Sequence, residues 1–154
     1  MINVRIPAPT RQRVRSRHIA AVVLLNAALA PLHNVAANDF SMSPAFSGSY
    51  VWNVSVDGAG ATSNPTLYLL RGRTYTFHVT GLAGFHSFYI NTASGLGSAN
   101  AYTGGGLSAN GITSDGTVSF DVPQDAPDIL YYNCGIHASM AGQIDVAIFR
   151  DGFD

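Results

Sequence analysis

Apolar and polar residues alternate along several short stretches of the chain between residues 50 and 148. Alternation with a period of two places successive side chains on opposite faces of a β-strand, so each stretch predicts a strand with one buried face. In the stretch 74–79, for example, Tyr75, Phe77 and Val79 share one face. The predicted strands lie at 50–56, 65–69, 74–79, 88–90, 117–122, 129–133 and 143–148.

Turn-forming residues separate these strands, as at 57–60 and 71–73, and no segment after residue 40 has the period of a helix. Several short strands divided by turns predict one all-β domain, an antiparallel sandwich or barrel, over residues 50–149. Residues 38–49 are predicted to be a loose lead-in to this domain, and residues 150–154 a short tail.

Residues 91–116 interrupt the strand pattern with a long stretch rich in Gly, Ser, Asn and Thr. A loop of this length in a compact domain is usually either functional or disordered. Two interpretations stay open for it: a cover over a functional site, or a family-specific insertion.

The N-terminal segment has the composition of a secretory signal peptide. Residues 1–18 contain five arginines and no acidic residue, an apolar run at 19–30 follows, and Val35-Ala36-Ala37 supplies small residues for cleavage. The run is too short for a stable membrane span, although a membrane-anchoring helix is the alternative interpretation. We predict a signal peptide at 1–37, export to the periplasm, the cell surface or the medium, and a mature chain without a membrane span.

Removal of residues 1–37 would leave three arginines, no lysine and nine aspartates, a formal net charge of −6. This balance argues against binding nucleic acid, which requires a basic surface. It permits electrostatic steering toward a positively charged partner, and it also favours solubility.

Cys134 is the one cysteine of the chain, and His137 and Met140 follow it at three-residue intervals. A cysteine without an intramolecular partner in an exported protein is a free thiol, an intermolecular disulfide or a metal ligand. Thiolate, imidazole and thioether together form a donor set that selects copper. His86, at the start of a distant predicted strand, is the best candidate for a second imidazole.

Other chemistries fit these residues less well. Cys134 alone could be a buried core residue, and so could Met140. A cysteine hydrolase needs a base and an orienting group placed by the fold, and the sequence has no local signature of one. Zinc prefers closed Cys/His ligation, for which methionine is a poor ligand. His78 falls on the polar face of its strand and is predicted to be solvated.

The Cys-x2-His-x2-Met spacing resembles the ligand loop of the cupredoxin (type 1 blue-copper) family, and is similar to the short loop of amicyanin. Residues 64–79, His86 to Ile90 and 118–127 also look like strands of small cupredoxins. The resemblance implies a Greek-key β-sandwich or barrel holding one copper ion. Cys134 would be the thiolate ligand, His86 and His137 the equatorial imidazoles, and Met140 the weak axial ligand.

The resemblance also implies a function: an electron carrier, not an enzyme, that cycles between Cu(I) and Cu(II). A redox partner would dock near His137, and we expect a monomer. One departure is visible, because many cupredoxins have Asn next to the first histidine, whereas Phe85 and Ser87 flank His86. In those proteins the Asn links the strand of the first histidine to the cysteine loop. We expect Asn133 to supply part of that link.

Two alternative functions use the same fold. The first is a copper-binding or delivery protein without an electron-carrier role, and the second is a metal-free binding domain. An oxidase is disfavoured, since a single small domain offers no second copper site.

Overall fold

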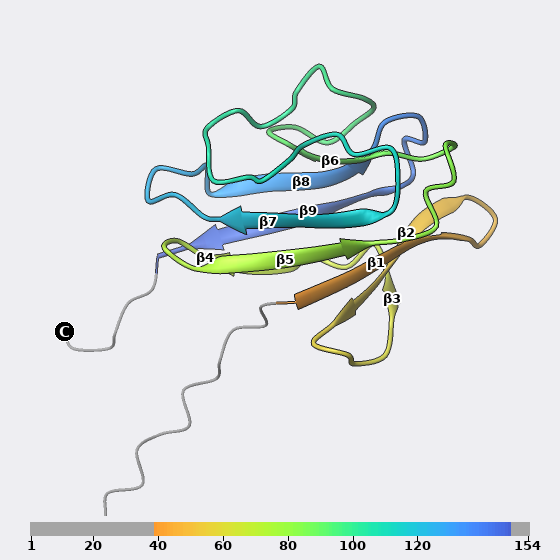
Figure 1. Cartoon of the computed structure of the whole chain (residues 1–154), viewed down its shortest axis with the longest axis horizontal. Helices are drawn as coiled ribbons and strands as arrows, with labels where there is room; N and C mark the ends of the chain where they lie inside the picture. Colours follow the sequence, from red (N-terminus) through yellow and green to blue (C-terminus); the bar gives the residue numbers. More distant parts are fainter. Residues whose placement is uncertain (1–38, 149–154) are drawn as a thin grey trace, which may run out of the picture. The chain divides into compact units, whose positions relative to one another are not determined.

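The computed structural model describes residues 39–148, which form nine β-strands and no helix (Figure 1). The predicted signal peptide at 1–37 and the predicted tail at 150–154 lie outside the described residues. Within residues 39–148 there is no helix that could span a membrane. The strands are β1 (Asp39–Phe46), β2 (Tyr50–Val56), β3 (Thr62–Ser63), β4 (Leu67–Leu70), β5 (Thr74–Val79), β6 (Phe88–Asn91), β7 (Gly116–Asp121), β8 (Ile129–Cys134) and β9 (Ala141–Ala147).

The strands form two sheets, with the orders β3-β2-β1-β5-β7 and β4-β9-β8-β6. The inner faces of both sheets contribute to one apolar core, in which Phe88 contacts Trp52 and Phe77 of the other sheet at ring-centroid distances of 5.7 and 5.6 Å. The predicted all-β sandwich is therefore confirmed, and each predicted strand is present with ends shifted by a few residues.

The sheets are mixed, so the expectation of purely antiparallel strands is wrong at two pairings. β1 pairs in parallel with β5, and β4 pairs in parallel with β9. Both pairs join strands that are distant in the sequence. A period-two pattern identifies the buried face of a strand but does not identify its neighbour or the direction of that neighbour.

The predicted lead-in at 38–49 is also wrong, because most of it is strand β1. This strand pairs with both β2 and β5, and it buries Phe40 and Met42 in the core. The ring centroid of Phe40 lies 5.0 Å from that of Phe77. The sequence signal for this strand was weak, because only two alternating apolar positions precede Ser43 and Pro44. Pairing with two neighbouring strands stabilises it.

The loop between β6 and β7 lies along the edges of both sheets (Figure 1). Isolated bridges join Phe88 to Ile112 at β6 and Leu107 to Phe120 at β7. The Asn110 side chain exchanges hydrogen bonds of 2.8 Å with the backbone N–H and C=O of Ile90. This loop therefore covers the backbone groups of two edge strands, which would otherwise be open to pairing with other chains.

Candidate metal centre

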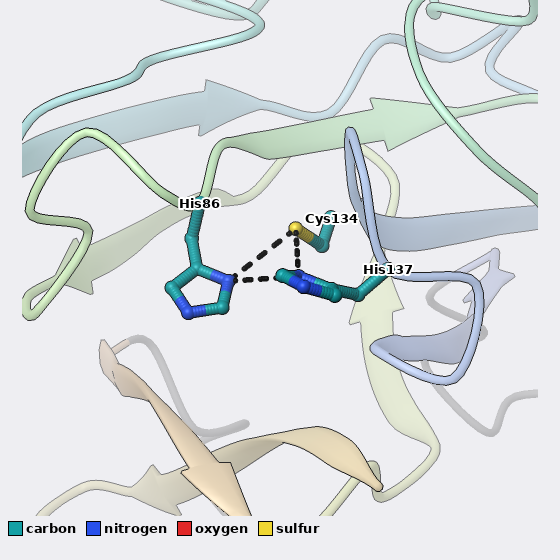
Figure 2. A group of neighbouring side chains, drawn as sticks. All are labelled: His86, Cys134 and His137. Atoms are coloured by element: carbon teal, nitrogen blue, oxygen red, sulfur yellow. Dashed lines mark hydrogen bonds between the residues drawn. The ribbon is translucent and has the colours of Figure 1, made fainter.

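Three of the four predicted ligands converge at one end of the sandwich (Figure 2). His86 comes from the segment between β5 and β6, Cys134 ends β8, and His137 lies in the turn before β9. The Cys134 Sγ atom lies 3.7 Å from His86 Nδ1 and 3.6 Å from His137 Nδ1, and the two Nδ1 atoms are 3.1 Å apart. Three segments distant in the sequence thus present two nitrogens and one sulfur to a single point.

The size of this triangle suits a metal ion. A point equidistant from the three donor atoms lies about 2.0 Å from each, given their separations. Typical distances in protein sites are about 2.0–2.1 Å from metal to histidine nitrogen and about 2.3 Å from metal to thiolate sulfur, as measured for zinc. The donor atoms therefore need to move by only a few tenths of an ångström to bind a metal in trigonal geometry.

The electrostatics of the site favour neutral imidazole. Burial lowers the pKa of His86, and the neighbouring His137 lowers it further. A lowered pKa keeps the ring deprotonated over more of the pH range, and the neutral ring is the form that binds a metal. Cys134 is fully buried, so its sulfur faces the two imidazoles and not solvent.

Met140 closes the turn that carries the other two ligands of this loop. The Cys134 N–H donates to the Met140 carbonyl at 2.8 Å, and the Met140 N–H donates to the His137 carbonyl at 3.0 Å. The Met140 side chain is fully buried. The backbone of residues 134–140 thus forms a closed turn that holds all three potential donors of this loop.

The tie between the His86 segment and the cysteine loop is made by Ser87, and the expectation that Asn133 would supply it is wrong. The Gly135 N–H donates to Ser87 Oγ at 3.0 Å. Asn133 instead donates to the Ala93 carbonyl at 3.4 Å. The register decides this, because Phe88 pairs with Cys134 and so places Ser87 beside Gly135, while Asn133 faces the opposite side of the sheet from Cys134.

Asp115 supports the segment that presents His86. Its carboxylate accepts a hydrogen bond from the Leu82 N–H at 2.9 Å, and the Phe85 and His86 amides donate to the Leu82 carbonyl at 2.9 and 3.1 Å. The backbone amides of Gly81 and Leu82 lower the pKa of the exposed Asp115 carboxyl. Nothing near Asp115 in the sequence marked it for this role.

Ser139 joins the ligand loop to β2. Its hydroxyl donates to the Tyr50 carbonyl at 2.6 Å, and its own carbonyl accepts from the Asn64 side chain at 2.8 Å. The same Asn64 side chain accepts from the Trp52 N–H at 2.8 Å. Asn64, Ser139 and Asp115 were not predicted from the sequence, because each acts through a contact with a residue distant along the chain.

Comparison with known proteins gives structural likenesses only. No protein-family model matches the sequence, and no curated protein sequence is significantly similar to it. A methionine-to-leucine variant of rusticyanin is similar, with 23% identity over 70% of this chain and 75% of that chain and a TM-score of 0.45. Rusticyanin from Thiobacillus ferrooxidans is 24% identical over 70% of this chain and 75% of that one, with a TM-score of 0.42.

A variant of the multicopper oxidase McoA from the hyperthermophile Aquifex aeolicus is also similar, with 14% identity and a TM-score of 0.42. The match covers 71% of this chain and 26% of the oxidase.

The assignment of a metal centre depends on the topology and the donor set of the chain itself. Two mixed sheets pack around one core, and a Cys-His-Met turn at one end meets a histidine from a distant segment. The described residues form an all-β sandwich, and the donor atoms of His86, Cys134 and His137 at one end of it could hold one metal ion. Two imidazole nitrogens and a thiolate sulfur are a donor set that suits copper.

Proposed function

We propose that this chain is an exported type 1 copper protein that carries single electrons between redox partners. The observation that carries the proposal is the convergence of the Cys134 sulfur with the Nδ1 atoms of His86 and His137. These three residues would be the equatorial ligands, and Met140 the weak axial ligand. The copper ion supplies the one-electron couple, and the protein supplies its position, its surroundings and a route to its partners.

The contribution of the chain is a rigid donor set. The Ser87–Gly135 bond, the Cys134–Met140 backbone bond and the Ser139–Tyr50 bond hold three sides of the ligand loop. A site that is already built needs little rearrangement when its charge changes. Four protein donors also leave no open position for a substrate, unlike a catalytic metal site, so the proposal includes no substrate turnover.

The distribution of charge favours docking at the site end of the molecule. Exposed apolar side chains surround the site there: Phe46 is 69% exposed, Phe85 73% and Ile136 60%. Of the charged residues between 39 and 148, Asp115 lies near this end. The others lie toward the opposite end, on strands or in the turns that join the strand ends there, and these are Asp39, Asp57, Arg71, Arg73, Asp121, Asp125, Asp128 and Asp145.

We therefore propose that the redox partner docks near His137 with an uncharged, apolar surface. Screening by salt acts on charged pairs. The rate of electron exchange with such a partner is expected to change little between low and high ionic strength.

A copper delivery role is the second candidate, and one observation favours it. Both His86 and His137 are only half-buried, so two of the donors reach the surface of the protein. A delivery protein needs copper that exchanges readily with an acceptor. An electron carrier needs copper that stays bound through many cycles and a fast reversible couple.

The test is the visible spectrum of the purified protein loaded with Cu(II). A thiolate–copper bond of the type 1 kind is expected to give an intense band near ~600 nm that ascorbate bleaches and reoxidation restores. Reversible voltammetry with slow copper loss to a chelator would support the carrier, and rapid loss would support delivery. A colourless protein without bound copper would contradict both the electron-carrier role and the copper-delivery role.

A further inference from the structure

Tyr50 lies over the two imidazoles of the site. Its ring centroid is 4.3 Å from that of His137 with the planes tilted by 39°, and 5.1 Å from that of His86 in an edge-on arrangement at 66°. Tyr50 begins β2 and is directly opposite Phe46, the last residue of β1. The two rings meet edge-on with centroids 5.2 Å apart.

The main chain of Tyr50 is attached to the same loop that its side chain covers. Its carbonyl accepts the hydroxyl of Ser139, which lies two residues after His137. The Asn64 side chain donates a hydrogen bond to the Ser139 carbonyl at 2.8 Å. Ring and backbone of Tyr50 therefore make two separate contacts with the ligand loop, and this fixes the ring relative to His137.

The exposure of these residues shows what the ring does. Tyr50 is 40% exposed, whereas the imidazoles beneath it are half-buried and Cys134 is fully buried. Tyr50 thus separates part of the imidazole surface from solvent. Offset and edge-on aromatic contacts at these distances are favourable beyond simple burial of area, so the ring also restrains the orientation of His137.

We propose that Tyr50 is a positioning residue that covers the metal site: it orients His137 and shields both imidazoles, which slows copper release and excludes small exogenous ligands. This inference depends on the proposed copper function. It concerns a residue outside the ligand loop, contributed by the β1–β2 hairpin.

The test compares three variants with the wild-type protein. Tyr50→Leu removes the aromatic ring but keeps an apolar side chain, and Tyr50→Phe keeps the ring. The matched control is Tyr68→Leu, which alters a tyrosine on β4 that is 70% exposed. Copper release to a chelator and binding of azide to the Cu(II) form are measured for each protein, after circular dichroism has established that it is folded.

Tyr50→Leu is expected to release copper roughly 2- to 10-fold faster, the range that corresponds to the loss of one aromatic contact. Azide is expected to change the visible spectrum of this variant and not that of the wild-type protein. Tyr50→Phe and Tyr68→Leu are expected to match the wild type. Equal release rates and no azide binding in Tyr50→Leu would overturn the inference.

A measurement on the metal-free wild-type protein provides a readout that does not depend on a variant's folding. Stacking on Tyr50 is expected to shift the His137 ring-proton resonances upfield, and the absence of that shift would overturn the inference. The two proposals fail in different ways. A wild-type protein that does not bind copper overturns the proposed function as well, whereas a blue wild type with an unchanged Tyr50→Leu overturns only the role of Tyr50.

Discussion

The side-chain oxygen of Ser87 accepts a hydrogen bond from the backbone amide of Gly135 at 3.0 Å. This bond joins the segment that carries His86 to the turn that carries Cys134 and His137. A Cβ atom at Gly135 would collide with Ser87 Oγ and would approach the Tyr89 ring to 3.1 Å, so the close contact requires glycine there. The two residues hold the halves of the site in register before any metal binds.

Replacing Ser87 with alanine is expected to lower the free energy of unfolding of the metal-free protein by about 1–3 kcal/mol, because the Gly135 amide loses its partner in a mostly buried position. Urea denaturation followed by tryptophan fluorescence measures the change. Ser94→Ala, at an exposed position of the β6–β7 loop, is the matched control and is expected to be close to neutral. Equal stability of Ser87→Ala and the control would show that the bond contributes little.

Cys134→Ser is expected to abolish the visible colour of the copper-loaded protein, since the intense band of a type 1 site arises from the thiolate–copper bond. Absorption spectroscopy at matched copper loading measures the effect. The substitution is nearly isosteric at a fully buried position, and near-wild-type circular dichroism would show that the fold is retained. A Cys134→Ser variant that stays blue would remove the cysteine from the ligand set.

Met140→Gln is expected to keep copper but to lower the reduction potential, because a harder axial oxygen donor favours Cu(II) over Cu(I). Voltammetry of both proteins under identical conditions measures the difference. Met42→Leu, a volume-conserving change at another buried methionine, is the control and is expected to leave the potential unchanged. An unchanged potential in Met140→Gln would mean that Met140 does not approach the metal.

Asp115→Asn is expected to change the acid sensitivity of the metal-free protein. Hydrogen bonds from the Gly81 and Leu82 amides lower the pKa of Asp115 in the folded state. The stabilisation by this carboxylate is therefore fully present above its unfolded-state pKa of about 3.9 and is lost as the pH falls through the lower folded-state value.

The unfolding free energies of wild type and Asp115→Asn are accordingly expected to differ at pH 6 and to converge as the pH falls below about 4. Denaturation at a series of pH values measures this. Asp125→Asn, at an exposed position toward the opposite end, is the control. A difference between wild type and Asp115→Asn that does not vary with pH would contradict the role of the charge.

Most strands could be predicted from the sequence because their inner residues alternate with a period of two, as Tyr75, Phe77 and Val79 do. Strand β1 could not, since its alternation covers only Phe40 and Met42, and its place in the sheet depends on pairing with β2 and β5. The parallel pairings of β1 with β5 and of β4 with β9 were missed for the same reason. Alternation is a property of one strand, whereas pairing is a property of two.

The candidate ligands divide in the same way. Cys134, His137 and Met140 were selected by the sequence alone, because residues at three-residue intervals within one short turn can face one site with little dependence on the rest of the chain. The structure brings the donor atoms of Cys134 and His137 together. His86 was chosen by its chemistry, but only the pairing of β6 with β8 brings it within 3.7 Å of the Cys134 sulfur.

Ser87, Asp115, Ser139 and Tyr50 support the site through contacts that only the tertiary structure creates. Their residue types are common and their sequence neighbourhoods carry no signal, since a hydrogen bond or a ring contact depends on distance in space. The sequence by itself therefore determined most of the strands and the donor chemistry, which depend on local periodicity and residue type. The tertiary structure decided which strands are neighbours, which residue joins the two halves of the site and which ring covers it, because these depend on register and packing between distant segments.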